Sequence, residues 1–184
     1  MTFTLEHLAI PGPVIVRSRV FNDTRGYFME TWSREKFAAL GITSDFVQEN
    51  QSLSRTQFTV RGLHFQRPPF EQAKLVRVLA GRVIDVAVDI RRSSPTFGRW
   101  CAVTLTAGDG KQVYIPRGFA HGFLSLEPDT LVVYKVDASY APAHEGGIVW
   151  NDRDIGVRWP VADADILLSE RDRVLPRLAD LPVE

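Results

Sequence analysis

The sequence predicts an all-β fold, a sandwich or barrel with small helical appendages. Three observations support this prediction: several short segments alternate apolar and polar residues, glycine and proline turn signals separate them, and one segment alone has a convincing helical pattern. With 184 residues, of which 45% are hydrophobic, the chain is long enough to bury a sizeable core. We therefore expect residues 1–184 to form a single domain.

The clearest strand signal follows Gly81. The alternating residues are Val83, Asp85, Ala87 and Asp89 against Ile84, Val86, Val88 and Ile90. This alternation puts branched apolar side chains on one face of a strand. Similar short runs occur at residues 13–20, 74–79, 100–106, 112–115 and 130–136, with turn signals at residues 80–81, 107–110 and 127–129.

One helix interrupts the strands. Its pattern runs from Ser33, a favourable N-cap residue, through Phe37 to Gly41, which ends it. A second short helical turn is expected to begin at Ser169, because the spacing from Ser169 to Asp172 is that of a capping box.

The composition argues against several classes of protein. With 22 basic and 22 acidic side chains the formal net charge is zero, so no overall field attracts the chain to nucleic acid or to an anionic membrane. Cys101 is the single cysteine, which is typical of a reducing compartment, and we expect it to be a small buried hydrophobic residue. The sequence shows no targeting segment and no apolar run near the ~20 residues of a membrane span. These features predict a cytoplasmic protein without nucleic-acid or membrane partners.

Two segments, Arg61-Gly-Leu-His-Phe-Gln66 and Ile115-Pro-Arg-Gly-Phe-Ala-His-Gly-Phe123, each present one histidine. The spacing Gly110-x5-Pro116-x-Gly118-x2-His121 resembles the second motif of the cupin superfamily, whose fold is a jelly roll. The first cupin motif usually carries two histidines and a glutamate that bind a metal. Here His64 is the one imidazole and Lys74 takes the glutamate's place. Because an ammonium group repels a divalent cation, we predict no metal; no phosphate-binding or dinucleotide motif predicts a cofactor either.

The remaining polar groups suit acid/base chemistry. A histidine such as His64 or His121 has an unperturbed pKa of ~6.5, and a cation such as Lys74 or Arg61 can stabilise an oxyanion. This set is typical of proton abstraction next to a carbonyl. Taken singly, each histidine would more often be a hydrogen-bonded core or rim residue, and Lys74 a solvated strand charge. Their joint placement in the two cupin segments favours an acid/base site.

Further blocks extend the resemblance to a particular family. They are Phe21-Asn-Asp-Thr-Arg-Gly-Tyr-Phe-Met-Glu30, Phe46-Val-Gln-Glu-Asn50, Ser52-Leu-Ser54, Gln72-Ala-Lys-Leu-Val76, Asp85-Val-Ala-Val-Asp-Ile-Arg91, Ser94-Pro-Thr-Phe-Gly98, Tyr134-Lys135, Trp150-Asn-Asp152, Trp159-Pro160 and Leu168-Ser-Glu-Arg-Asp172. Together with the two histidine segments, these blocks resemble the dTDP-4-dehydrorhamnose 3,5-epimerases, the sugar-nucleotide epimerases of the rhamnose pathway.

The resemblance implies four catalytic residues. His64 would be the base, oriented by Asp172; Tyr134 would be the acid on the opposite face of the sugar; and Lys74 would approach the 4-keto oxygen. Spacing alone would instead leave Asp172 to complete the Ser169 capping box, and Tyr134 would be another strand aromatic.

The resemblance also implies a set of substrate-binding residues. They are Arg25, Glu30, Gln48, Asn50, Arg61, Lys74, His121, Tyr140, Glu145 and Arg171. Arginines suit a diphosphate, and an aromatic face such as that of Tyr140 suits the thymine base. Arg171 stands where we expect a lysine, which alters the geometry of that contact. Without the resemblance, Arg25 and Glu30 would be an exposed loop pair, and Tyr140 a loop anchor.

The resemblance implies a cofactor-independent, metal-free homodimer whose N-terminal strands contribute across the interface. It would epimerise dTDP-4-dehydro-6-deoxy-D-glucose at C3 and C5 to dTDP-4-dehydro-L-rhamnose. One alternative is a relative that inverts C3 or C5 alone for another deoxysugar pathway. A second is a non-catalytic cupin that binds sugar nucleotides, although such a protein is expected to lack His64, Tyr134 or Asp172, and all three are present.

Overall fold

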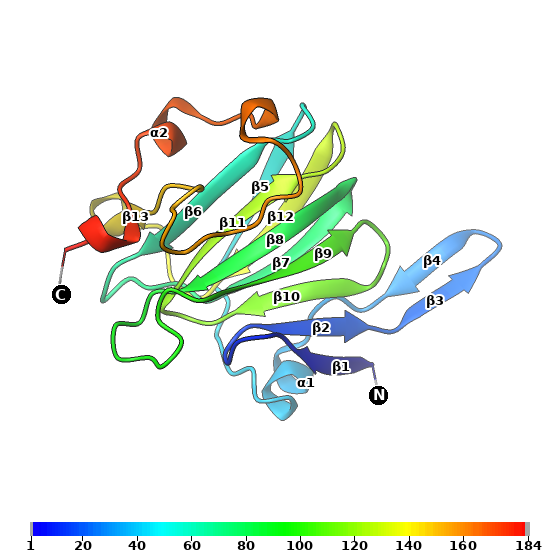
Figure 1. Ribbon diagram of the computed structural model, residues 1–184. Coiled ribbons are helices and arrows are strands. Elements are labelled where there is room, and N and C mark those ends of the chain that lie inside the picture. The colour runs from blue at the N-terminus through cyan, green and yellow to red at the C-terminus, as the bar shows by residue number, and fades with distance from the viewer. Residues whose placement is uncertain (1, 183–184) are drawn as a thin grey trace.

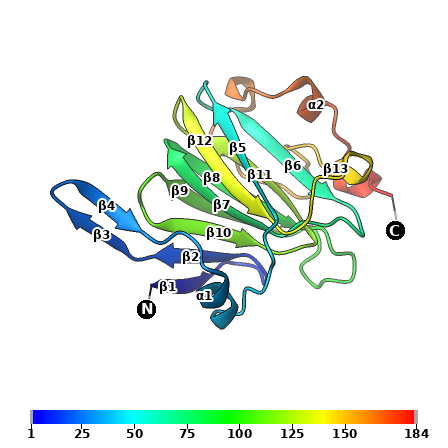
Figure 2. The same ribbon diagram turned by 180° about the vertical axis from the view of Figure 1, so that it is seen from behind.

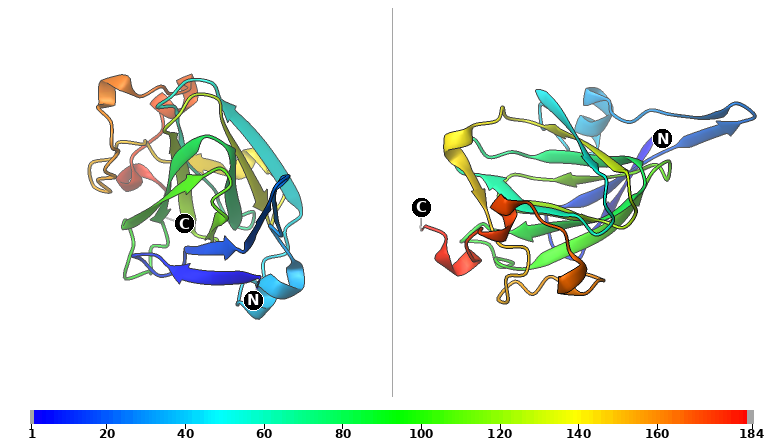
Figure 3. Two further views of the ribbon diagram at one scale, coloured as in Figure 1. Left: turned by 90° about the vertical axis from the view of Figure 1, so that its right-hand side faces the viewer. Right: turned by 90° about the horizontal axis from the view of Figure 1, so that it is seen from above.

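The computed structural model describes residues 2–182, which form two facing antiparallel sheets and a projecting hairpin (Figure 1). The large sheet consists, in spatial order, of β1 (Phe3–His7), β2 (Val14–Ser18), β10 (Lys111–Ile115), β7 (Lys74–Ala80), β12 (Thr130–Val136) and β5 (Gln48–Ser54). The small sheet consists of β13 (Glu145–Gly147), β6 (Val60–Gln66), β11 (Phe119–Ser125), β8 (Arg82–Asp89) and β9 (Trp100–Thr106). Figure 3 shows the two sheets facing each other, so the predicted all-β fold is confirmed.

The helical elements are small, as predicted. They are α1 (Arg34–Ala39), α2 (Glu170–Arg173) and the 3-10 turns η1 (Pro142–His144), η2 (Asp163–Asp165) and η3 (Leu178–Asp180). Ser33 caps α1 by accepting the Lys36 N–H at 3.4 Å, and Gly41 ends it at a φ of +85°. The helix buries Phe37 edge-on against Phe3, with the ring centroids 4.9 Å apart. No helix in the described part of the chain is long and apolar enough to cross a membrane.

Strand β8 is buried on both faces. Its branched residues, such as Val86 and Val88, form one face and pack against the C-terminal part of the chain, including Ile148 and Leu178. The other face points between the two sheets, where Ala87 lies in the core with Cys101. Cys101 is buried, as predicted, and burial raises the pKa of its thiol to about 12. The polar face of the predicted alternation is therefore the interior of the barrel.

Strands β6 and β11 approach each other unusually closely, at Gly62 and Gly122. A Cβ added at Gly62 would lie 2.6 Å from the Gly122 Cα, and the φ of +126° at Gly62 also favours glycine. One step along the ladder, His121 pairs in register with His64. The two glycines thus permit the backbone approach that sets the two histidines side by side.

The hairpin of β3 (Val20–Asp23) and β4 (Gly26–Met29) projects from the barrel, as Figures 1 and 2 show from opposite sides. Phe21, Tyr27 and Phe28 on this hairpin are 47%, 56% and 69% exposed. Clustered exposed aromatic side chains of this size are typical of a surface that meets another molecule. The predicted strand at residues 13–20 is interrupted, because β2 ends at Ser18 and β3 begins at Val20.

Candidate active site

Two adjacent cavities lie between the sheets and share three polar residues. Their volumes are about 390 and 520 Å³, and both are lined by His64 from β6, Lys74 from β7 and Tyr134 from β12. His64 comes from the small sheet, whereas Lys74 and Tyr134 come from the large sheet. A molecule held between the sheets can therefore meet His64 and Tyr134 from opposite sides.

His64 is hydrogen-bonded to Asp172 of α2, with 2.6 Å between the imidazole Nε2 and the carboxylate Oδ1. Burial tends to raise the pKa of the Asp172 carboxyl, but the hydrogen bond and charge of His64 hold it below its usual range, with help from Ser169 and the Gly62 amide. The Ser169 hydroxyl accepts the backbone N–H of Asp172 at 3.1 Å. Ser169 therefore caps the helix while the Asp172 carboxylate faces His64. The helix cap and the contact with the histidine occur together.

Lys74 is a buried cation. Its side chain is hydrogen-bonded to the His64 carbonyl at 3.4 Å, and the residue is 8% exposed. Burial lowers the pKa of the Lys74 ammonium to about 8, while the charges of Asp85 and Glu145 oppose that fall. A desolvated cation of this kind interacts strongly with any negative charge that develops beside it.

Tyr134 is a neutral phenol at the junction of the two cavities. Burial raises the pKa of its hydroxyl, and the charge of Arg61 and a hydrogen bond with Asn50 oppose the rise. A protonated phenol in a desolvated site can donate a proton to a developing carbanion.

A second histidine–carboxylate pair lies deeper in the barrel. His121 Nε2 is 2.8 Å from Asp85 Oδ2, and both side chains are buried. Burial lowers the pKa of His121; Lys74 and His64 lower it further, while Asp85 opposes the change. Asp85 has no predicted role in the sequence analysis. The available signal was a carboxylate in a strand of alternating residues, and Asp89 on the same strand gives the same signal.

Most of the predicted binding residues line these two cavities. Gln48, Asn50, Tyr140 and Glu145 line the smaller one, and Arg61, His121, Arg171 and Asp172 the larger. At their rim, Glu145 accepts hydrogen bonds from the Tyr140 hydroxyl at 2.6 Å and pairs with the Arg171 guanidinium at 2.8 Å. Sequence reasoning missed Gln66, whose amide is hydrogen-bonded to Ser139 and Ala141 on either side of Tyr140.

Arg25 and Glu30 do not reach the cavities of their own chain. Arg25, at the tip of the β3–β4 hairpin, forms an ion pair with Asp23 at 2.6 Å. Glu30 is paired with Lys36 of α1 at 2.5 Å. If Arg25 and Glu30 contact substrate as predicted, that substrate must lie outside the two cavities of their own chain.

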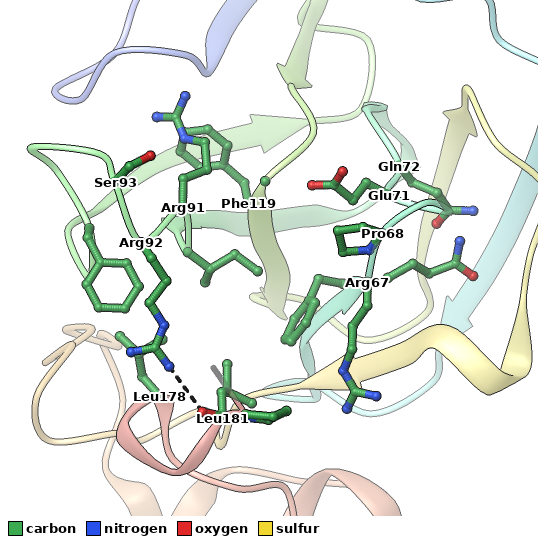
Figure 4. Close-up of a pocket in the computed structure, with 16 residues that line it drawn as sticks. Arg67, Pro68, Glu71, Gln72, Arg91, Arg92, Ser93, Phe119, Leu178 and Leu181 are labelled. Carbon is green, nitrogen blue, oxygen red and sulfur yellow. Dashed lines mark hydrogen bonds between the residues drawn. The ribbon is translucent and has the colours of Figure 1, made fainter. Parts of the chain in front are cut away.

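A further cavity of about 340 Å³ contains none of the predicted site residues (Figure 4). Its arginines already have partners: Arg91 lies over the Phe119 ring, 4.6 Å from the centroid, and Arg92 donates to the Leu181 carbonyl at 3.1 Å. No three His, Cys, Asp or Glu side chains in residues 2–182 are arranged to hold a metal ion. The candidate site is therefore the pair of cavities around His64.

Comparison with known proteins identifies the family of the chain. The family model described as dTDP-4-dehydrorhamnose 3,5-epimerase matches residues 7–180. The chain belongs to this family. It is 46% identical over 182 residues to the dTDP-4-dehydrorhamnose 3,5-epimerase of Sinorhizobium fredii, covering 97% of this chain and 91% of the relative. The predicted family and enzyme class are confirmed.

Two solved structures extend the comparison. The dTDP-6-deoxy-D-glucose-3,5-epimerase of Legionella pneumophila, in complex with dTDP-4-keto-L-rhamnose, aligns with a TM-score of 0.93 at 38% identity, covering 98% of this chain and 95% of the other. ChmJ, a 3′-monoepimerase from Streptomyces bikiniensis in complex with dTDP-quinovose, aligns with a TM-score of 0.86 at 38% identity, covering 94% and 86%. The likeness to the epimerase structures confirms the jelly-roll fold.

Proposed function

We propose that this enzyme epimerises dTDP-4-dehydro-6-deoxy-D-glucose at C3 and C5, yielding dTDP-4-dehydro-L-rhamnose for dTDP-rhamnose biosynthesis. One observation carries the proposal: His64 and Tyr134 lie on facing sheets, and the buried Lys74 cation lines the same two cavities. A base and an acid on opposite sides are what inversion of a carbon centre requires.

The base is His64. Its Nε2 is hydrogen-bonded to Asp172, so Nδ1 is the nitrogen that takes the proton from the carbon next to the 4-keto group. The C–H electron pair moves into an enolate, and the charge that develops on its oxygen is stabilised by Lys74. Asp172 stabilises the imidazolium that forms.

The acid is Tyr134. Its phenol gives a proton to the same carbon from the opposite face, the enolate returns to the ketone, and the configuration is inverted. His64 then passes its proton to solvent and Tyr134 is reprotonated, so neither a metal nor a redox cofactor takes part in any step. Repetition at the second flanking carbon completes the conversion.

The remaining cavity residues bind the nucleotide. Arg61 and Arg171 supply guanidinium groups for the diphosphate, and the half-exposed Tyr140 supplies an aromatic face for thymine. The other predicted contacts are Gln48, Asn50, His121 and Glu145.

The proposal includes a homodimer in the cytoplasm. The exposed aromatics of the β3–β4 hairpin support the dimer, and so does the position of Arg25 and Glu30 outside their own cavities. In a dimer, the hairpin supplies Arg25, and the segment that follows it supplies Glu30, to the partner's cavity. Sedimentation equilibrium should give twice the chain mass of 20.7 kDa; a monomer at assay concentration contradicts the dimer. A lone buried thiol, Cys101, is compatible with a reducing cytoplasm.

A second candidate is inversion of a single carbon. It is supported by the likeness to ChmJ, described as a 3′-monoepimerase, whose fold aligns over 94% of this chain. Substrate incubated with wild-type enzyme in deuterated water separates the two candidates. Proton NMR of the recovered sugar should show deuterium and inversion at both C3 and C5; exchange and inversion at one carbon support the second candidate.

The variant Tyr134→Phe tests the assignment of the acid. It keeps the base and Lys74 but removes the proton donor on the far face, so deprotonation continues and His64 returns the proton. The sugar should exchange its C3 or C5 hydrogen for deuterium while keeping its configuration, with inversion slowed by about 10²-fold or more. Inversion of both centres at a near wild-type rate would show that Tyr134 is not the acid.

A further inference from the structure

Asp85 is a buried carboxylate with one unused oxygen. Its side chain is 1% exposed, and Oδ2 is bonded to His121. Oδ1 has no hydrogen-bond partner; among the buried side-chain nitrogen and oxygen atoms of the described residues, only Ser52 Oγ shares this property. Leaving a buried charged oxygen unpaired is costly, so a protein that retains one needs a compensating interaction.

The buried Lys74 ammonium has titratable or charged neighbours on five other strands and on α2. They include Asp85 on β8, Glu145 on β13, His64 and Arg61 on β6, His121 on β11, Tyr134 on β12 and Asp172 on α2. Asp172 is bonded to His64. The carboxylates whose charges act on Lys74 are Asp85 and Glu145, and neither forms a direct ion pair with it among the described residues. Glu145 is already bonded to Tyr140 and Arg171. The negative charge left to balance Lys74 is therefore mainly that of Asp85, acting through space.

Asp89 shows what a purely structural carboxylate looks like on the same strand. It is fully buried, four residues beyond Asp85, and Arg91, Ser94 and Thr96 saturate its oxygens at 2.6–3.0 Å. Its charge is neutralised by Arg91, whose ion pair measures 2.7 Å. Asp85 has no arginine partner among the described residues; its partner is His121, which lines the same cavity as Lys74.

We infer that Asp85 is a positioning residue of the reaction: bonded to His121, its carboxylate is the counter-ion that keeps Lys74 protonated inside the barrel. A buried ammonium without a nearby negative charge releases its proton, and a neutral amine is a poor partner for an enolate oxygen. The role in the reaction depends on the proposed epimerase function; the charge balance between Asp85 and Lys74 does not.

The first test measures protonation of Lys74 without turnover. Dilute acetic anhydride labels neutral amines, and mass spectrometry reports labelling of Lys74 against Lys36, Lys111 and Lys135 as a function of pH. In Asp85→Asn the half-labelling pH of Lys74 should fall by about one unit, a roughly tenfold rise in the ratio of neutral to charged amine. Asp89→Asn is the matched control and should leave the half-labelling pH unchanged.

The second test is the pH dependence of kcat/KM. The alkaline limb of the profile, where Lys74 loses its proton, should move to lower pH by the same amount in Asp85→Asn and stay in place in Asp89→Asn. Asp85→Ser, which leaves room for a water molecule beside His121, gives the same expected shift if the Asn variant does not fold. An unchanged half-labelling pH in both Asp85 variants overturns the inference. If the wild-type protein shows no epimerase activity but the labelling curve still shifts in the Asp85 variants, the proposed function is overturned. The effect of Asp85 on the protonation of Lys74 then still holds.

Discussion

The barrel contains two histidine–carboxylate pairs that differ in exposure and in origin. In the outer pair, the His64 side chain is 32% exposed and Asp172 6%; in the inner pair, His121 is 7% exposed and Asp85 1%. The hydrogen bonds are similar, at 2.6 and 2.8 Å, and each uses the histidine Nε2. The two imidazoles also stand opposite each other on β6 and β11. The chemical groups are therefore the same, and the two pairs differ in how deeply they are buried.

The origin of the carboxylates explains the difference. Asp85 lies on β8, a strand that pairs directly with the strand of His121, so the inner pair is part of the sheet. Asp172 comes from α2, which reaches the sheet through few contacts besides its bond to His64. A solvent-accessible imidazole can exchange protons with a substrate, whereas a desolvated one is better suited to holding charges in place.

The largest expected effect breaks the outer pair. His64→Ala and Asp172→Ala should each lower turnover by 10²–10⁴-fold, on the order usual for positioned acid/base groups. Because the two residues act as a unit, combining both substitutions should lower turnover by a far smaller factor than the product of the two single losses. Steady-state kinetics of the three variants measures this. Ser169→Ala, which removes the α2 cap but leaves the Asp172 carboxylate, is the control and should cost less than about tenfold. Multiplicative losses, or an equal loss in Ser169→Ala, would return Asp172 to a capping role.

Replacing the cation next to the inner pair should separate stability from activity. Lys74→Met keeps the shape of the side chain, removes the stabilising charge and should lower turnover by about 10²–10³-fold. The same variant should be more stable at pH 7. The fall in the pKa of Lys74 from 10.5 to about 8 corresponds to a burial cost of about 3 kcal/mol at or below neutral pH.

The pH dependence of the higher stability of Lys74→Met shows whether it comes from removing the buried charge. Between pH 8 and 10.5 the unfolded chain still binds the Lys74 proton while the folded chain releases it, so wild-type stability rises with pH. The advantage of Lys74→Met should therefore shrink across this window. Urea unfolding at pH 7, 9 and 10 measures it, with Lys36→Met as an exposed control. A destabilised Lys74→Met at pH 7 would contradict the view that function, not stability, keeps this cation buried.

Sequence patterns predicted the strands whose apolar residues alternate, and α1 with its Ser33 cap. They did not predict β5, because Gln48–Ser54 is largely polar and becomes a strand by pairing with β12 along its whole length. The polar face of β8 was equally hard to interpret. Alternation normally means that one face meets solvent, but here both faces are buried. The polar face points between the sheets, where Asp85 is bonded to His121.

The candidate site divides in the same way. His64, Lys74 and His121 lie in two recognisable motifs, and the structure brings them together as predicted. Asp172 lies 108 residues from His64, and its local spacing is explained equally well by a helix cap, so its contact depends on tertiary structure. Asp85 was missed because nothing local distinguishes it from Asp89 on the same strand.

The smallest expected effect concerns the rim contact that holds the outer pair. Arg171 precedes Asp172 on α2 and forms its ion pair with Glu145 at 2.8 Å, with the arginine side chain 52% exposed. An exposed pair of this kind contributes little, about 0.2–1 kcal/mol, so Arg171→Ala should lower kcat by about twofold to fivefold through a less well-held Asp172. Arg171→Lys keeps the charge but not the planar geometry and should fall between Arg171→Ala and wild type.

Arg173→Ala, on the same helix and also exposed to solvent, is the matched control and should change kcat by less than twofold. The inner pair has no comparable rim contact, so its chemistry should not respond to either arginine: the alkaline limb set by Lys74 should stay in place in all three variants. Separate values of kcat and KM decide the role of Arg171. A rise in KM alone would mean that Arg171 only binds the diphosphate, whereas a fall in kcat with the alkaline limb unmoved would show that the outer pair, and not the inner one, depends on how α2 is held.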